Sequence, residues 1–181
     1  MNALALALAA ALLSASPSSP QAPAPSAGGL TWKVPAAWTA EGPRPMRAAT
    51  YRLPAVKGDA EGAELAVFHF GRGQGGDVDA NVKRWLGQFT RPDGSPVDAD
   101  ARRKQEKLNG LGVTTVDVQG TYNPGMMMGP ATPKPGWRLL GTIVEGGSEG
   151  PVFFKLTGPA RTVAAAQKDF QKLLQSVKRG G

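Results

Sequence analysis

The stretch from Glu64 to Phe89, ELAVFHFGRGQGGDVDANVKRWLGQF, contains the residues whose types and spacing could most readily serve chemistry. Gly71, Gly73 and Gly76 form a G-x-G-x-x-G pattern between a strand-like and a helix-like segment. In dinucleotide-binding proteins such glycines bring the backbone close to a pyrophosphate at the N-terminus of the next helix. The pattern raises the question of whether this chain binds a phosphate-bearing cofactor.

The residues after the helix-like segment argue against a dinucleotide site. Such a site needs a second buried parallel strand soon after the helix, whereas residues 90–107 are almost all polar. Asp93 lies near the distance of the acidic residue in the dinucleotide pattern, but it is part of a Pro-Asp-Gly turn. No Gly-Lys-Ser/Thr follows the glycines, which also argues against a P-loop. No cofactor is therefore predicted.

We expect the glycines to form a structural turn from a strand into a helix, because glycine adopts positive φ freely. An alternative remains open, since free backbone N–H groups at a helix N-terminus can bind an anion. In that alternative, the small-ligand or anion site would consist of Arg72, Gln74, Gly75 and Gly76. Trp85 or Tyr122 would line it.

Met126, Met127 and Met128 form the second candidate cluster. Thioethers suit Cu(I), but three consecutive side chains converge poorly on one ion, and the sequence has no second Met or His cluster. We expect instead an apolar loop that packs on the sheet or contacts a partner. No metal site is predicted.

His69 is the only histidine, so a Ser-His-Asp triad would have to use it. No G-x-S-x-G elbow accompanies it, and the carboxylates form no persuasive acid–base pair. The sequence therefore predicts no catalytic residue and a chain that is not an enzyme.

The N-terminal residues 1–29 carry no charge and divide into an Ala/Leu run and a leader rich in Pro, Ser and Ala. A short apolar run followed by small residues is typical of a secretory signal peptide. Ala15, Ser16 and Ser26 are the candidate last residues before cleavage. A disordered tail is the alternative, because a basic start is missing. The expected organisation is a leader over 1–29 and one globular domain over 30–181.

The chain has 181 residues, no cysteine and a formal net charge of +7. The absence of cysteine excludes disulfides, thiolate metal sites and a lipid-modified cysteine. The basic residues are spread along the chain without interleaved aromatic residues, so no nucleic-acid partner is predicted. We expect a soluble extracytoplasmic protein, periplasmic or secreted, with no membrane span once the leader is removed.

The elements expected to position these residues alternate between strands and helices. Period-2 and period-3.6 apolar patterns predict the strands and helices, and the links have the length of hairpins. The polar residues 98–107 are expected to form a loop or a short exposed helix. The fold class is α/β (α+β): an α/β/α sandwich whose central, mainly antiparallel sheet of about six strands carries helices on its faces. The predicted strands span 30–34, 46–53, 64–70, 111–122, 137–146 and 152–156, and the predicted helices span 77–89 and 162–177.

Several segments together resemble a set of exported bacterial proteins of unassigned function, and more distantly the PsbP-like fold. The segments are LTWKVPAAW, MRAATYRL, AELAVFHFGRGQGGDVDANVKRWLGQF, GTY…MMMGP, WRLLGTIVEG, GPVFFKLTGP and a C-terminal F-x-x-L-L-x-S helix. The resemblance covers residues 30–178 and implies an α/β/α sandwich. It also implies a non-catalytic accessory or assembly protein of the bacterial envelope with a protein partner, but not a photosystem subunit.

Overall fold

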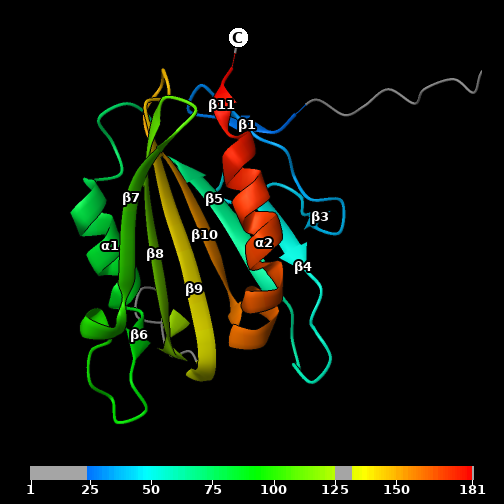
Figure 1. The fold of residues 1–181 in the computed structure, drawn as a ribbon, viewed down its shortest axis with the longest axis vertical. Helices are drawn as coiled ribbons and strands as arrows, with labels where there is room; N and C mark the ends of the chain where they lie inside the picture. The colour runs from blue at the N-terminus through cyan, green and yellow to red at the C-terminus, as the bar shows by residue number, and fades with distance from the viewer. Residues whose placement is uncertain (1–23, 125–131, 181) are drawn as a thin grey trace, which may run out of the picture.

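An antiparallel sheet between two helices forms the framework of the computed structural model, which describes residues 24–124 and 132–180 (Figure 1). Among these residues the sheet has eight strands, six of them longer than two residues. The predicted α/β/α sandwich with about six strands is confirmed. In spatial order the strands are β3 (Thr39–Ala40), β4 (Ala49–Leu53), β5 (Ala63–His69), β10 (Val152–Pro159), β9 (Lys134–Glu145), β8 (Leu111–Tyr122) and β6 (Phe89–Thr90), with β7 (Arg102–Leu108) also paired to β8.

The two helices cover opposite faces of the sheet (Figure 1). The long C-terminal helix α2 (Ala160–Ser176) buries Phe170 and its neighbours against one face. The shorter helix α1 (Val78–Leu86) buries Trp85 and its neighbours against the other. β9 lies between them and is buried on both faces from Arg138 to Val144. This explains why its sequence is apolar without alternation.

Gly141 in β9 allows α1 to approach the sheet closely. A Cβ atom at this position would lie 2.5 Å from two ring carbons of Trp85 and 3.0 Å from Val116. We expect Gly141→Ala to lower the free energy of unfolding by about 1–3 kcal/mol, because overpacking forces the helix away. Gly112→Ala is the matched control, since its nearest atom would be 3.7 Å away. Urea unfolding measures both, and equal effects would contradict this packing.

A small antiparallel sheet joins the two ends of the described chain. It consists of β1 (Ser26–Ala27), β2 (Leu30–Thr31) and β11 (Lys178–Arg179). Ser26–Ala27 lie before residue 30, where the domain was expected to begin, so the folded part includes the last residues assigned to the leader. The predicted strand over 30–34 is limited to Leu30–Thr31, although Trp32 is also buried.

The prediction of a loop or short exposed helix over residues 98–107 holds only for Asp98–Asp100 and is wrong from Arg102 onward. A short 3-10 helix spans Asp98–Asp100, and β7 then runs along β8 as an edge strand. The turn between these strands is Asn109-Gly110, with φ angles of 53° and 75°. Asn-Gly is the preferred pair for a two-residue hairpin turn, because both residues tolerate positive φ. This dipeptide was the available signal for a hairpin. The charged composition of β7 suits an exposed edge.

No helix within the described ranges is both long enough and apolar enough to cross a bilayer.

Candidate functional site

The glycine turn connects β5 to α1 as a structural turn. Gly71, Gly73, Gly75 and Gly76 all have positive φ, between 70° and 94°. This confirms the prediction that these glycines adopt positive φ in a structural turn from a strand into a helix. β5 pairs antiparallel with both β4 and β10, so the turn does not join the parallel strands of a dinucleotide-binding unit.

Side chains and close packing hold this turn in place. The buried Asn81 side chain donates from Nδ2 to the carbonyls of Gly75 at 2.7 Å and Asp77 at 2.8 Å. Asp77 caps α1 by accepting from the Ala80 N–H at 2.7 Å, as its position predicts. A Cβ on Gly75 would lie 2.7 Å from the Phe70 ring. The glycines are thus explained by packing and backbone conformation.

The residues of the proposed anion site do not converge in the structure. Arg72 donates from Nη2 to the Ser148 carbonyl in the β9–β10 turn, and Gln74 is exposed. A hollow beside Gly76 is lined by the carboxylates of Asp77, Asp79 and Glu145 and by Arg103, which is already paired with Asp79 at 2.6 Å. Carboxylates already occupy the positive end of the helix there, and they oppose a bound anion.

The other sequence candidates lie elsewhere. Trp85 is buried between α1 and Gly141, whereas Tyr122 lies beyond the C-terminal end of α1, with its ring 5.0 Å from that of Phe89. His69 Nδ1 lies 3.1 Å from the Pro151 carbonyl oxygen. The methionines Met126, Met127 and Met128 lie outside the described residues.

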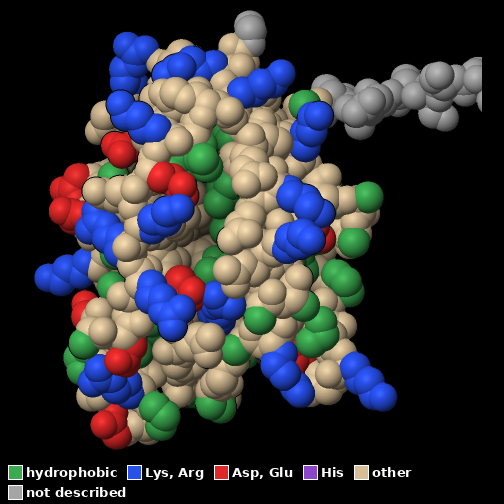
Figure 2. All heavy atoms as spheres, viewed as in Figure 1, with side chains coloured by type: hydrophobic (Ala, Val, Ile, Leu, Met, Phe, Trp, Pro, Cys, Tyr) green, Lys and Arg blue, Asp and Glu red, His purple; other side chains and the backbone are tan. Residues whose placement is uncertain are grey.

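A groove of about 420 Å³ lies between α2 and β7, on the α2 face of the sheet. We call it the α2–β7 groove. Figure 2 shows it as a hollow in this face of the molecule, with Lys and Arg side chains along its β7 side. The groove forms because α2 packs on β9 and β10, whereas β8 and β7 extend beyond it.

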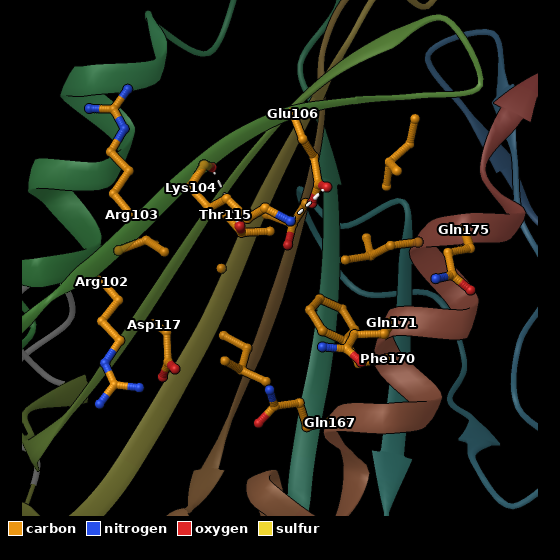
Figure 3. A pocket seen from close by; sticks show the side chains of 16 residues that line it. Arg102, Arg103, Lys104, Glu106, Thr115, Asp117, Gln167, Phe170, Gln171 and Gln175 are labelled. Carbon is orange, nitrogen blue, oxygen red and sulfur yellow. Dashed lines mark hydrogen bonds and ion pairs between the residues drawn. The ribbon is translucent and has the colours of Figure 1, made fainter.

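The walls of the α2–β7 groove carry long polar side chains (Figure 3). Gln167, Gln171 and Gln175 recur at every fourth residue of α2, so they form a row along one side of the helix. Arg102 and Lys104 project from β7 on the opposite wall. The groove is thus bounded by amides on one side and mainly by cations on the other.

Asp117 lines the α2–β7 groove and forms an ion pair with Arg138, which is buried and does not itself line the groove. Arg138 is 7% exposed and donates from Nε and Nη2 to the two Asp117 carboxylate oxygens, at 2.7 Å each. Its Nη2 also donates to the Gln167 side chain at 2.9 Å, so the pair connects the sheet to α2. On the wall, Lys104 is paired with Glu106 at 2.8 Å. Both carboxylates of the groove are therefore engaged by cations.

One polar atom of the floor lacks a partner. Thr142 is fully buried, and its Oγ1 has no hydrogen-bond partner among the described residues. A buried hydroxyl without a partner costs free energy.

The sequence analysis did not identify the groove residues. The helix over 162–177 was recognised by its apolar stripe, and the row of Gln167, Gln171 and Gln175 was the available signal for a polar wall. The opposite wall was missed because β7 was not recognised as a strand. No group of three or more His, Cys, Asp or Glu suited to a metal occurs in the part of the chain that the structure describes.

No family model matches the sequence, and no curated protein matches it. Several solved structures are similar in fold. Cyanobacterial PsbP (CyanoP) from Synechocystis sp. PCC 6803 has a TM-score of 0.51 and 12% identity, over 84% of this chain and 88% of that protein. Protein PA94 of unknown function from Pseudomonas aeruginosa, described as a putative regulator, has a TM-score of 0.47 and 15% identity, over 85% and 99%. A protein from Bacteroides thetaiotaomicron VPI-5482 has a TM-score of 0.46 and 13% identity, over 87% and 47%.

At these identities the likeness concerns the fold. The order of the elements, the antiparallel sheet and its two covered faces agree with the similarity to cyanobacterial PsbP. The chain has a PsbP-like fold.

Proposed function

We propose that this protein is a non-catalytic binding or accessory protein of the bacterial envelope, and that it holds a polypeptide segment of a partner in the α2–β7 groove. The observation that carries the proposal is the row of three glutamines facing the cationic wall of β7. A primary amide both donates and accepts hydrogen bonds, as a peptide group does. Gln171 and Gln175 can therefore pair with peptide groups of a bound chain, while the side-chain oxygen of Gln167 already accepts from Arg138.

The charges of the groove favour an acidic segment. Arg102 and Lys104 lie on the wall, and Lys104 is the one already paired with Glu106. Arg102 forms no ion pair within the described ranges, although it pairs through its backbone with Asp117 in β8. Arginine at an interface binds carboxylates in a two-pronged geometry. An acidic side chain of the partner beside Arg102 would fit this wall.

Acid–base chemistry has less support in this groove than binding. The carboxylates of Asp117 and Glu106 are both engaged in ion pairs. A general base needs to reach a substrate proton, and these two groups face basic side chains instead. These contacts support a role in binding.

The extracytoplasmic location rests on the composition of residues 1–29, with its apolar run followed by small residues. The absence of cysteine is compatible with an oxidising compartment, because no thiol needs protection there. Cell fractionation with mass spectrometry of the N-terminus tests this part. A full-length chain in the cytoplasm would contradict it.

Affinity capture from the envelope fraction tests the groove. The double variant Gln171→Ala/Arg102→Ala should reduce capture of the partner by about 10-fold, since it removes an amide and a charge from opposite walls. Lys172→Ala is the matched control, because Lys172 is exposed on α2 but does not line the groove. Equal capture by the double variant and the wild type would refute the groove, provided that circular dichroism shows both to be folded.

A further inference from the structure

A second cavity lies on the opposite face of the sheet from the α2–β7 groove. Its volume is about 280 Å³ and its lining comes from β4, β5, β8, β9 and β10. We call it the Lys155 cavity. Typical ligand sites span about 300–1,000 Å³, so this cavity suits only a small molecule or a terminal group.

Lys155 contributes an ammonium group to this cavity from the middle of β10. Its Nζ donates to the Gln88 side-chain oxygen and lies 5.4 Å from the centre of the Tyr122 ring. The residue keeps partial exposure, but protein atoms surround the ammonium group. Desolvation, with a smaller contribution from Arg47, lowers the pKa of Lys155 to about 8. In the part of the chain that the structure describes, no carboxylate lies within ion-pair distance of this ammonium.

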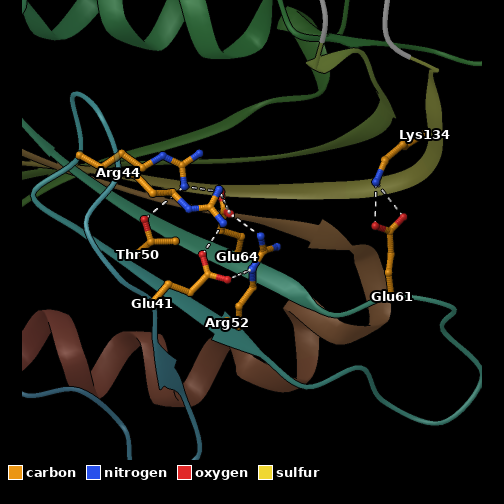
Figure 4. Close-up of polar contacts among 8 residues, drawn as sticks. Glu41, Arg44, Thr50, Arg52, Glu61, Glu64 and Lys134 are labelled. Atoms are coloured by element: carbon orange, nitrogen blue, oxygen red, sulfur yellow. Dashed lines mark hydrogen bonds and ion pairs between the residues drawn. The ribbon is translucent and has the colours of Figure 1, made fainter.

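The other cations around the cavity are paired (Figure 4). Arg47 contacts Glu64 at 2.7 Å, and Lys134 contacts Glu61 at 2.7 Å. Arg52 lies between Glu41 at 2.5 Å and Glu64 at 3.3 Å. Glu41 is also paired with Arg44, so the three carboxylates are shared among four cations, whereas Lys155 is bound to a neutral partner.

Thr157 supplies a second donor on the same side of β10. Lys155 and Thr157 are two residues apart, so both side chains point to the same face of the strand. Thr157 is 8% exposed and lines the cavity, and its Oγ1 has no hydrogen-bond partner among the described residues. This hydroxyl thus has an unused hydrogen bond to donate on the same face of β10 as the ammonium.

Aromatic rings form an apolar wall of the same cavity. The Tyr122 and Trp137 rings stack with centroids 5.3 Å apart, and Phe68 also lines the space. Lys134 lies over the Trp137 ring at 4.4 Å. Because the stacked faces are occupied, a ligand would meet the ring edges and would not insert between the rings. The cavity thus combines one unpaired positive charge, one free hydroxyl and an apolar wall.

We propose that the Lys155 cavity binds a small carboxylate, with Lys155 and Thr157 contacting its two oxygens and the aromatic wall receiving its apolar part. Lys155 and the aromatic wall together match a small organic carboxylate better than phosphate, because phosphate has no apolar part to place against the rings. A carboxylate accepts charge-assisted hydrogen bonds from both donors. The carboxylate could belong to a free organic acid or to the C-terminus of a polypeptide.

Calorimetric titration of the full chain with acetate, propionate and benzoate, at constant ionic strength and pH 7, tests this site. At least one of these anions should bind, and that anion should bind at least 10-fold more weakly to Lys155→Met and to Thr157→Val. Lys172→Met is the matched charge control and should bind as the wild type does. Inorganic phosphate should bind more weakly than the preferred carboxylate. One short peptide is then titrated in two forms, with a free and with an amidated C-terminus. The comparison distinguishes a polypeptide C-terminus from a free organic acid as the source of the carboxylate.

A peptide that binds only with its free C-terminus would assign the cavity to a polypeptide end, and binding of the free acids alone would assign it to a metabolite. The proposal is overturned if no carboxylate of either kind binds the wild type, or if phosphate binds more tightly. It is also overturned if both cavity variants retain full affinity. Thr157→Val keeps the size of the side chain, so it remains informative if Lys155→Met fails to fold.

Discussion

Lys155→Met is expected to raise the free energy of unfolding at pH 7 by about 2–3 kcal/mol. The pKa of Lys155 is lowered from 10.5 to about 8, mainly by desolvation. Each pKa unit corresponds to about 1.4 kcal/mol of cost for keeping the ammonium charged in the folded protein. Methionine fills a similar space without a charge, and the lost hydrogen bond to Gln88 offsets about 1 kcal/mol of the gain.

The cost of burying the charged ammonium exists only while Lys155 is protonated. The difference in free energy of unfolding between Lys155→Met and the wild type, called the stability gap below, therefore depends on pH. Below pH 8 the lysine is protonated in both the folded and the unfolded state, so the full cost is present. Between pH 8 and 10.5 the unfolded state binds more protons, so the stability of the wild type rises with pH relative to the variant. Above 10.5 the lysine is neutral in both states and the cost disappears.

Guanidinium unfolding at pH 7, 9 and 10.5 measures this gap. Arg47, Glu64 and Tyr122 face the ammonium and are present in both proteins, so the comparison isolates the contribution of Lys155. Lys172→Met, on an exposed part of α2, should show no gap at any pH. A constant gap for Lys155→Met, or a destabilised variant, would show that the ammonium is not a buried charge.

Asp117→Ala is expected to lower the free energy of unfolding by about 3–5 kcal/mol. The substitution leaves the Arg138 guanidinium buried without its carboxylate, and an unpaired buried charge is strongly destabilising. Adding Arg138→Met should recover much of the loss, because the charge is then removed as well. Glu106→Ala breaks an exposed pair in the same groove and should cost at most about 1 kcal/mol.

Thermal and chemical unfolding of the wild type, Asp117→Ala, Asp117→Ala/Arg138→Met and Glu106→Ala test whether the unpaired Arg138 charge causes the loss of stability. If Asp117→Ala and Glu106→Ala cost the same, the Asp117–Arg138 pair behaves as a surface pair and does not fix the groove floor. A double variant less stable than Asp117→Ala would mean that Arg138 stabilises the protein through other contacts, such as its bond to Gln167.

Much of the fold could be predicted because its strands and helices have clear apolar periods. β8 has the predicted bounds, Leu111–Tyr122, and α1 begins after Asp77, which caps it as expected. β7 could not be predicted from hydrophobicity, because its side chains are mostly exposed and charged. The Asn109-Gly110 dipeptide indicated a hairpin turn and hence a strand before it, but an analysis of apolar periods does not detect turn residues.

The candidate sites were harder to predict, because they depend on which distant segments meet. The glycine run attracted attention as a motif, yet its residues are used for backbone conformation and close packing. The α2–β7 groove brings together residues from β7 and α2 that are far apart in the sequence, from Leu108 in β7 to Gln167 in α2 at the nearest. Lys155 was visible as a lysine within an apolar strand, but its lack of an acidic partner depends on the pairing of β10 with β5 and β9.

Photo-crosslinking in intact cells tests the central claim most directly. A photoreactive phenylalanine analogue is placed at Gln171, within the α2–β7 groove, or at the exposed Lys172, which does not line it. The account predicts a crosslink to a defined envelope protein from position 171, and none or a much weaker one from position 172. The Arg102→Ala substitution should weaken the crosslink from 171. Equal crosslinking from both positions, or none from 171 in a folded and exported protein, would contradict binding in the groove.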